Sequence, residues 1–382
     1  MSRLFIFILV FLSIYGGMHF YGFVRLKRGL ALETGMAVAL ALFMAVMVVA
    51  PIATRVTERL GYEVFARILA YIGYTWMGVL FIFISAAFVF DIYRMLLFFT
   101  GLILRTDLAW ITLAVRQSCL ISILLAFSIV IYGIFEALQI RTEYVTIRTA
   151  KLPITVERLR IVQISDIHLG LIVGKDRLKR ILRQVIKAKP DILVSTGDLV
   201  DGQMDNLSEL ADMLQRVSPP YGKFAVTGNH EFYAGLNRSL GFTEKAGFSI
   251  LRGEARSISN MINIAGVDDP ARGPYGPGNT VSEKALLSNL PHDRFTILLK
   301  HQPRVEKESL GRFDLQLSGH THKGQIFPFS LITNLFYQTH AGLAELQDHS
   351  MIYVSRGSGT WGPPVRFLAP PEVTVIDLVR AK

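Results

Sequence analysis

Cysteine is nearly absent from this chain of 382 residues, because Cys119 is the only one. A single cysteine excludes a disulfide framework, and its place in an apolar run disfavours thiol chemistry. Dense runs of Lys and Arg are also lacking, so we expect no nucleic-acid partner despite a formal net charge of +10. Charges are scarce in residues 1–140, which hold 10 Lys and Arg and 6 Asp and Glu, against 30 and 24 in residues 141–382. The chain therefore divides into an apolar region and a region of ordinary globular composition.

Four apolar stretches in the first region are long enough to cross a bilayer, whose core takes about 20 residues of helix. They cover residues 4–24, 36–53, 68–90 and 118–138. The first could be a cleaved signal peptide, but its length and the lack of a small-residue cleavage site favour a retained helix. No charged residue lies near the centre of the spans. The pathway of a transporter often requires such residues, so their absence disfavours a transporter. Residues 1–140 are therefore predicted to be a multi-pass anchor in the cell membrane, with the lipid bilayer as partner.

The distribution of Lys and Arg predicts which side of the membrane carries the second region. Four spans place both ends of the chain on one side. Slightly more Lys and Arg residues lie on that side than on the other. Because cytoplasmic loops are enriched in these residues, the second region is predicted to be cytoplasmic.

Five apolar runs in the second region each end in a cluster of polar side chains. Short β-branched runs bounded by Gly, Pro and Asn are typical of strands. Residues 175–188 have helical spacing and precede Pro190, which predicts a strand–helix–strand unit. Ligands of open α/β sheets gather at the carboxyl ends of strands, so the five clusters are expected to meet. The runs are "LRIVQISDIHLG" (159–170), "DILVSTGDLVDG" (191–202), "KFAVTGNHEFY" (223–233), "FTILLKHQP" (295–303) and "FDLQLSGHTHKGQ" (313–325).

The polar clusters have the composition of a metal site. Imidazole nitrogens together with carboxylate or amide oxygens suit Mn, Fe, Zn or a similar ion such as Mg. Seven candidate ligands are too many for one tetrahedral site. They fit two divalent ions about 4 Å apart that share a bridging carboxylate. Glycines beside the candidates allow tight turns and a close approach of the backbone. The candidate ligands are Asp166, His168, Asp198, Asn229, His301, His320 and His322, and the glycines are Gly197, Gly228 and Gly319.

The motifs "SDIHLG", "TGDLVDG", "GNHE", "KHQP" and "SGHTHKGQ" resemble, in order and spacing, those of the calcineurin-like metallophosphoesterases. "LSGHTHKGQIFP", "YVSRGSGTWGPPVR" and "PPEVTVIDL" resemble a membrane-linked subgroup, which includes enzymes that cleave nucleotide–lipid pyrophosphates. The resemblance covers about residues 155–382. It implies an α/β sandwich of two mixed sheets flanked by helices, in residues 159–382, after a linker and lead-in strand in 141–158.

The resemblance also implies roles for the residues of these motifs. His230 would donate a proton to the leaving group, and Glu231, where the family usually has Asp, would orient His230 or weaken it as an acid. Lys323, where the subgroup usually has glycine, would bind an anionic substrate or be a solvated loop lysine. One ion would be held by Asp166, His168, Asp198 and His322, and the other by Asn229, His301, His320 and Asp198, which bridges the two.

Three loops rich in Pro, Gly or aromatic residues flank the motifs, at 268–280, 325–338 and 361–372. Their large side chains either fill the core and cover a sheet edge, or form a rim for an acyl chain while Arg366 or Lys323 meets phosphate. Candidates for this rim are Phe327, Phe329, Leu331, Phe336, Tyr337, Trp361 and Phe367.

The expected function is that of a membrane-anchored phosphoesterase with two metal ions. It would hydrolyse a phosphodiester or pyrophosphate bond by attack of a metal-bound hydroxide, and a lipid-linked compound is one candidate substrate. The alternative is a metal-binding sensor or assembly protein with weak or lost catalysis. The complete ligand set favours the first interpretation.

Overall fold

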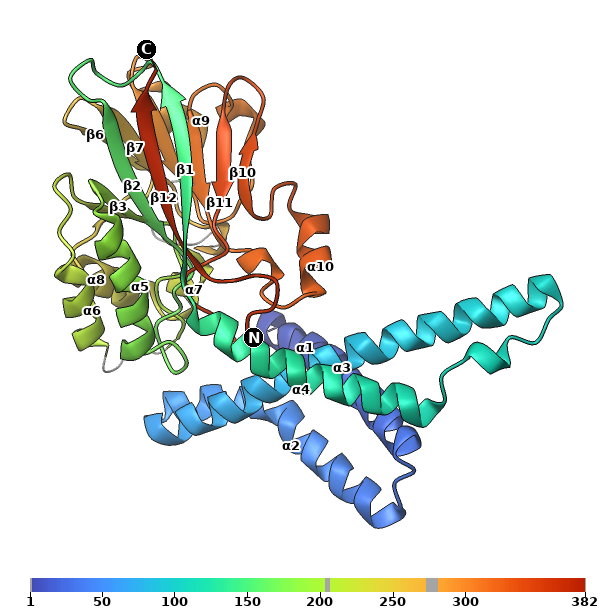
Figure 1. The fold of residues 1–382 in the computed structure, drawn as a ribbon. Coiled ribbons are helices and arrows are strands. Elements are labelled where there is room, and N and C mark those ends of the chain that lie inside the picture. Colours follow the sequence, from blue (N-terminus) through green and yellow to red (C-terminus); the bar gives the residue numbers. More distant parts are fainter. Residues whose placement is uncertain (1, 203–206, 273–280, 382) are drawn as a thin grey trace. The chain divides into compact units, whose positions relative to one another are not determined.

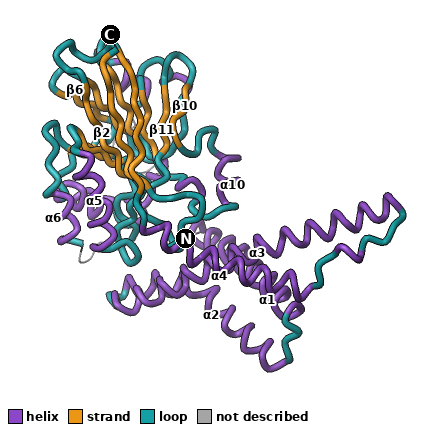
Figure 2. The backbone as a smooth tube through the Cα atoms, viewed as in Figure 1, coloured by secondary structure: helices purple, strands orange, loops and turns teal. Residues whose placement is uncertain are grey.

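The computed structural model describes residues 2–202, 207–272 and 281–381. The chain forms two compact units. Met1–Phe135 with Gly362–Val365 make up the helical unit, and Glu136–Trp361 with Arg366–Lys382 make up the α/β unit. Figure 2 shows that all strands belong to the α/β unit.

The helical unit contains four long helices, with a short 3-10 turn (Ala109–Ile111) before the last. Each is long and apolar enough to cross a membrane, with a mean hydropathy between 1.2 and 2.6 in its most apolar window. The four predicted spans are therefore confirmed as helices. They are α1 (Ser2–Gly29), α2 (Thr34–Arg59), α3 (Glu63–Leu104) and α4 (Val115–Leu138).

Helix α3 differs from the prediction, because it does not end at Phe90 but continues for 14 residues to Leu104. Asp91, expected beyond the end of the span, lies inside the helix and forms an ion pair with Arg25 at 2.9 Å. It also accepts a hydrogen bond of 2.6 Å from the hydroxyl of Tyr21. These partners offset the cost of a charge within an apolar helix. At 1.5 Å per residue α3 is roughly 60 Å long, about twice the thickness of a bilayer core.

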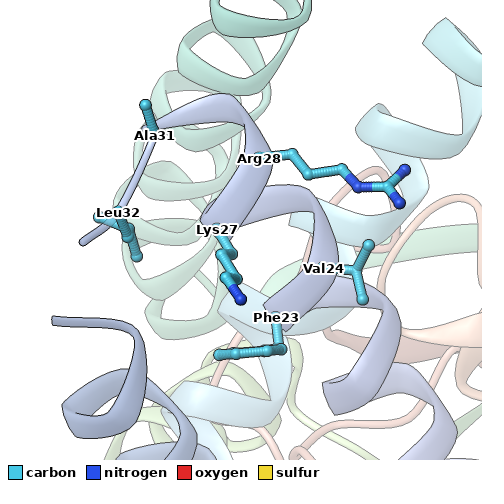
Figure 3. A pocket seen from close by; sticks show the side chains of 6 residues that line it. All are labelled: Phe23, Val24, Lys27, Arg28, Ala31 and Leu32. Carbon is cyan, nitrogen blue, oxygen red and sulfur yellow. The ribbon is translucent and has the colours of Figure 1, made fainter. Parts of the chain in front are cut away.

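A pocket lies at the end of α1 and in the turn that follows it (Figure 3). It has two basic side chains, Lys27 and Arg28, among apolar ones. None of the predicted metal ligands lines it. Its lining residues are Phe23, Val24, Lys27, Arg28, Ala31 and Leu32.

The first sheet of the α/β unit has the strand order β1-β12-β2-β3-β4-β5. β2 and β3 are parallel neighbours joined by α5 (Lys175–Ala188), which confirms the predicted strand–helix–strand unit. Helices α5, α6 (Ser208–Gln215) and α8 (Leu236–Lys245) lie on one side of this sheet (Figure 1). Its strands are β1 (Arg141–Thr149), β2 (Arg158–Ile164), β3 (Ile192–Ser195), β4 (Lys223–Ala225), β5 (Ser249–Ile250) and β12 (Glu372–Arg380).

The second sheet has the order β10-β11-β9-β8-β7-β6, with parallel and antiparallel pairs. Helix α9 (Glu283–Ser288) contributes to the apolar cluster on its outer face. The smaller elements of the unit are α7 (Asn229–Tyr233), α10 (Phe329–Phe336) and the 3-10 turns η2 (Pro270–Arg272), η3 (Lys307–Ser309) and η4 (His322–Gly324). The strands are β6 (Glu254–Ile258), β7 (Ile262–Gly266), β8 (Phe295–Leu299), β9 (Leu315–Ser318), β10 (Gly342–Glu345) and β11 (Met351–Val354).

The core lies between the two sheets because side chains alternate along each strand. Ile161 of β2 and Ile297 of β8 belong to the cluster between the sheets. Their neighbours point the other way: Val162 packs with α5, and Leu298 with α9. All five predicted strands are present, and the predicted sandwich of two mixed sheets flanked by helices is confirmed. The predicted lead-in region, residues 141–158, contains β1.

Candidate metal centre

The seven candidate ligands follow the carboxyl ends of five strands in two sheets. β2, β3 and β4 of the first sheet lead to Asp166 and His168, to Asp198, and to Asn229. β8 and β9 of the second sheet lead to His301, and to His320 and His322. The two sheets thus deliver acidic and imidazole groups to one end of the sandwich, as the sequence predicts.

The first group of side chains is Asp166, His168 and His322, all of them buried. Nε2 of His322 lies 3.4 Å from Oδ1 of Asp166 and 3.1 Å from Nε2 of His168. Such a cluster of lone-pair donors around one point is the arrangement that a divalent cation requires.

The second group is Asp198, His301 and His320. Nε2 of His301 lies 3.2 Å from Oδ2 of Asp198 and 3.2 Å from Nδ1 of His320. The same oxygen of Asp198 is 3.8 Å from Nε2 of His168, a member of the first group. One carboxylate therefore lies between the two groups, where a ligand shared by two ions would lie.

Two features of the backbone and side chains fit a pair of cations. Oδ1 of Asn229 is buried and has no hydrogen-bond donor among the described residues, so it is available as a ligand. A Cβ atom at Gly228 would lie 2.2 Å from Oδ1 of Asp198, and one at Gly319 would lie 2.2 Å from Oδ2 of Asp166. Only glycine permits these approaches, as the sequence predicts. The donor set therefore fits two divalent ions.

Five of the candidate ligands have a backbone in the left-handed region, which non-glycine residues rarely adopt. Strained conformations of this kind cluster at functional sites, where the surrounding structure holds them. The φ values are 50° for Asp166, 55° for His168, 51° for Asp198, 71° for His320 and 49° for His322.

The low pKa values of three of the four candidate imidazoles suit metal binding, because the neutral form has a free lone pair. The pKa of His301 is instead well above its ordinary value, because the negative charges of Asp198 and Asp166 outweigh the opposing effect of burial. Burial lowers the pKa of His168 and that of His320 to about 3 in each case. Burial and the nearby Arg366 hold the pKa of His322 well below its ordinary value. Nδ1 of His301 lies 2.8 Å from the carbonyl oxygen of Thr196, which can only accept, so Nδ1 carries the proton and Nε2 faces Asp198.

His230 lies beside the two groups and contacts Asp201. Its Nδ1 lies 3.0 Å from the carbonyl oxygen of Asp201 and 3.1 Å from the carboxylate oxygen Oδ1. Burial alone would lower the pKa of His230, but the charges of Asp198 and Asp201 outweigh it and raise this pKa to about 9. A protonated His230 could donate to a leaving group. Its role as an acid and not a ligand stays a prediction, because the ring is also within metal-binding reach of His168 and Asp198.

Glu231 does not orient His230, contrary to one of the two expectations for it. Its carboxylate points to the backbone and accepts hydrogen bonds from the N–H groups of Gly228 (2.6 Å), Asp198 (3.0 Å) and Leu199 (2.8 Å). Glu231 thus fixes the loop that carries Asp198, and Asp201 contacts His230 instead. The sequence prediction does not include Asp201, because only the first Asp of "GDLVDG" directly follows the strand and its glycine.

Arg366 is fully buried, so the expectation that it meets phosphate is wrong. Its Nη2 contacts Nδ1 of His322 at 2.9 Å, and its Nη1 donates to the carbonyl oxygen of the same residue at 3.1 Å. Arg366 therefore fixes the position of His322 from the Nδ1 side of its ring. Lys323 is half-buried, and its ammonium group has no ion-pair partner in the described part of the chain. Its contact with substrate stays a prediction.

Most of the predicted aromatic side chains near the site are exposed and do not fill the core, whereas Tyr337 and Phe367 are half-buried. Trp361 is 53% exposed and Tyr233 67%, and both rings approach that of His230, with centroids 5.8 and 5.5 Å away. The ring centroid of Tyr337 likewise lies 5.7 Å from the ring centroid of His320. Phe327, Phe329, Leu331 and Phe336 are also exposed. The predicted wall at 268–280 falls largely on residues 273–280, which lie outside the described residues.

The loop after β11 also supports the site, and the sequence prediction does not include it. The N–H of Ser358 donates to the carbonyl oxygen of Ser165 at 2.7 Å, and that of Gly359 donates to that of Asp166 at 3.0 Å. A Cβ atom at Gly359 would lie 2.0 Å from the carbonyl oxygen of Ile167. The loop therefore holds the strained Asp166–His168 turn, and the glycines of "RGSGTWG" are the signal that could have revealed it.

Comparison with known proteins agrees with this geometry. A family model described as calcineurin-like phosphoesterase matches residues 159–324. An uncharacterized metallophosphoesterase of Aquifex aeolicus (strain VF5) is 47% identical over 248 residues, which are 65% of this chain and 95% of that protein. A transmembrane protein with metallophosphoesterase domain from Danio rerio is 34% identical over 278 residues, 70% of this chain and 63% of that protein.

Among solved structures, a 5'-nucleotidase precursor from Thermus thermophilus aligns with 16% identity and a TM-score of 0.34. The alignment covers 58% of this chain and 54% of that one, and so loose a likeness carries no functional argument.

Proposed function

Because the chain belongs to the calcineurin-like phosphoesterase family, we propose that it is a membrane-anchored hydrolase that holds two divalent cations and cleaves a phosphodiester or pyrophosphate bond of a lipid-linked substrate. The observation that carries the proposal is the position of Asp198. Its Oδ2 lies 3.2 Å from His301 and 3.8 Å from His168, between the two groups of ligands.

Each group of side chains has a distinct task in this reaction. Two cations, when bound, would neutralise the phosphate oxygens and lower the pKa of a water molecule toward neutrality. Asp198 would contribute its carboxylate to both cation positions, because its Oδ2 lies between the two ligand groups. Asn229 offers a neutral oxygen, which leaves the site less negative than a further carboxylate would.

His230 protonates the oxygen of the leaving group. Asp201 holds the ring through Nδ1, which directs Nε2 away from it. The negative charge of Asp201 favours the protonated form of His230. The leaving group then lies next to His230, and hence next to Tyr233 and Trp361.

A lipid-linked substrate is supported by the apolar rim and by the membrane anchor. Phe327, Phe329, Phe336 and Trp361 expose between 40% and 77% of their surface near the ligands. Each CH₂ group of an acyl chain buried there would contribute about 0.8 kcal/mol. An anchored enzyme and a substrate in the same bilayer also meet at a raised effective concentration.

We further propose that the α/β unit is cytoplasmic, from the distribution of Lys and Arg around the four helices. Protease treatment of intact and of permeabilised cells tests this. Digestion of the α/β unit in intact cells would contradict the proposed orientation.

The reaction is tested with His230→Asn, because the wild-type protein and this variant should differ in rate but not in metal content. The purified full-length protein would be assayed with Mn²⁺, and with Fe²⁺, Zn²⁺ or Mg²⁺, on diesters with aryl and alkyl leaving groups. Loss of a general acid typically costs about 100- to 10,000-fold. That loss is expected for the alkyl leaving group and a smaller one for the aryl group, which needs no proton.

Two results would contradict the proposal. A wild-type protein that binds two ions but hydrolyses no phosphodiester or pyrophosphate would be a metal-binding protein without this activity. Loss of a bound ion in His230→Asn would make His230 a ligand.

A further inference from the structure

Helix α10 presents an apolar surface of which the proposed rim for an acyl chain uses only Phe329 and Phe336. Residues 324–344 contain no Asp, Glu, Lys or Arg. None of the eight residues of α10 is buried. Soluble proteins rarely expose so continuous an apolar surface unless it binds something. Its most exposed side chains are Leu331 (60%), Ile332 (44%), Leu335 (84%) and Phe336 (77%).

The strand order decides which end of the α/β unit carries the connection to the membrane helices. β1 is parallel to β12, with Arg141 opposite Glu372. β12 is antiparallel to β2, with Thr374 opposite Gln163. The start of β1 therefore lies at the same sheet edge as the end of β2, where Asp166 follows. The chain enters the α/β unit at the metal-ligand edge.

The connection is short. α4 ends at Leu138 and β1 begins at Arg141, so two residues separate them and span at most about 10 Å between the elements. The last turn of α4 is already part of the α/β unit. There the buried Glu136 accepts a hydrogen bond of 3.1 Å from the N–H of Leu368.

Helix α10 begins beside the same point. The N–H of Phe327 donates to the carbonyl oxygen of Phe367 at 3.1 Å, and Leu368 is the residue that contacts Glu136. The exposed Phe327 and Leu368 thus continue the apolar surface from α10 to the last turn of α4. Figure 1 shows α10 outside the two sheet layers of the unit, and the described part of the chain buries none of its residues.

We propose that the outer face of α10, with Leu331 and Leu335 at its centre, inserts into the interfacial layer of the bilayer that the chain's own helices span. Apolar side chains without nearby charge favour this layer over water. The contact places the metal centre at the level of lipid headgroups. It goes beyond the proposed reaction, because it would exist whichever phosphate compound is cleaved.

Fluorescence of a polarity-sensitive label on single cysteines tests the contact in the full-length protein. The label is placed by Leu335→Cys in a Cys119→Ala background, and the protein is reconstituted into vesicles of phosphatidylcholine and phosphatidylglycerol. Ile154→Cys is the matched control: it is 82% exposed, and it lies between β1 and β2, at the opposite end of the strands. Quenching is measured with a doxyl group near the top of the lipid acyl chain and with aqueous iodide.

The label at residue 335 is expected to emit at shorter wavelength and to be quenched several-fold more by doxyl lipid than the label at residue 154. Iodide should quench residue 154 more. Adding Leu331→Glu, one turn away on the same face, should return the label at residue 335 to the aqueous behaviour. This substitution concerns an exposed residue, so the fold should tolerate it.

Three outcomes would overturn the proposal. Equal quenching of both positions by iodide would leave α10 in water. Protection of residue 335 from both quenchers would mean that protein covers it, as a second copy of the chain would. Lipid quenching that persists in Leu331→Glu would remove the apolar face as its cause.

Discussion

Replacing Asp201 by Asn should impair proton donation more than it affects the metal centre, where Oδ1 of Asp201 lies 3.8 Å from Nδ1 of His168. Asp201 touches His230 twice, through its carbonyl oxygen at 3.0 Å and its carboxylate at 3.1 Å. Asparagine keeps the carbonyl oxygen and nearly the same shape, so the ring should remain in place. What disappears is the negative charge, and opposite charges at this distance typically shift a pKa by about 1 to 3 units.

The magnitude follows from the charges around His230. The pKa of His230 is raised to about 9 by Asp198 and Asp201 against the opposing effect of burial. Cations bound at Asp198 would cancel its share, which would leave Asp201 as the group that favours the protonated imidazole. Its removal should lower the rate with an alkyl leaving group by about 10- to 100-fold, as is usual for a partner that positions a functional group.

The assay compares kcat for an alkyl and an aryl diester and measures bound metal in the same samples. Glu231→Gln is the control, since the carboxylate of Glu231 accepts from backbone N–H groups around Asp198 and does not contact His230. It should lower the melting temperature and metal content and slow both substrates alike. Two results together would refute the reasoning and assign the orienting role to Glu231. The rate loss in Glu231→Gln would depend on the leaving group, and the rate loss in Asp201→Asn would be equal for both substrates.

Three further outcomes are expected. Asp198→Asn should lose most bound metal and nearly all turnover, because Asp198 lies between both ligand groups; two ions per chain with a normal rate would contradict the bridging role. Arg366→Met should lower the melting temperature and weaken metal binding about 10- to 100-fold, since it removes the donors to His322; a raised KM with unchanged metal affinity would instead indicate contact with substrate. Phe329→Ser and Trp361→Ser should raise KM for a lipid-linked diester and leave that for a water-soluble diester nearly unchanged; equal effects on both, at an unchanged melting temperature, would count against a lipid substrate.

The ends of the membrane helices show one limit of prediction from sequence. Hydropathy places four apolar helices correctly because each needs about 20 apolar residues. It fails at the end of α3, since a charged residue is taken as a boundary. Asp91 is tolerated inside the helix because Arg25 and Tyr21, both on α1 and far away in sequence, supply its partners. No local pattern contains that information.

The strands and ligand types could be predicted because each signal is local. A β-branched run followed by Asp, His or Asn predicts a strand with a polar end in any fold. Parallel strands end at one edge of a sheet, so these polar ends are expected to meet. The sequence therefore determined two units, five strands and the chemical class of the donor set.

Only the tertiary structure decided how side chains far apart in the sequence divide the work. Arg366 and Lys323 both carry positive charge near the ligands, but packing buries the first behind His322 and leaves the second half-exposed. Asp201 and Glu231 are both acidic and near His230 in the fold, and backbone geometry alone assigns the ring to one and the N–H groups of the loop to the other. Burial and direction depend on contacts between strands that fold together from distant positions, and composition and spacing carry no record of them.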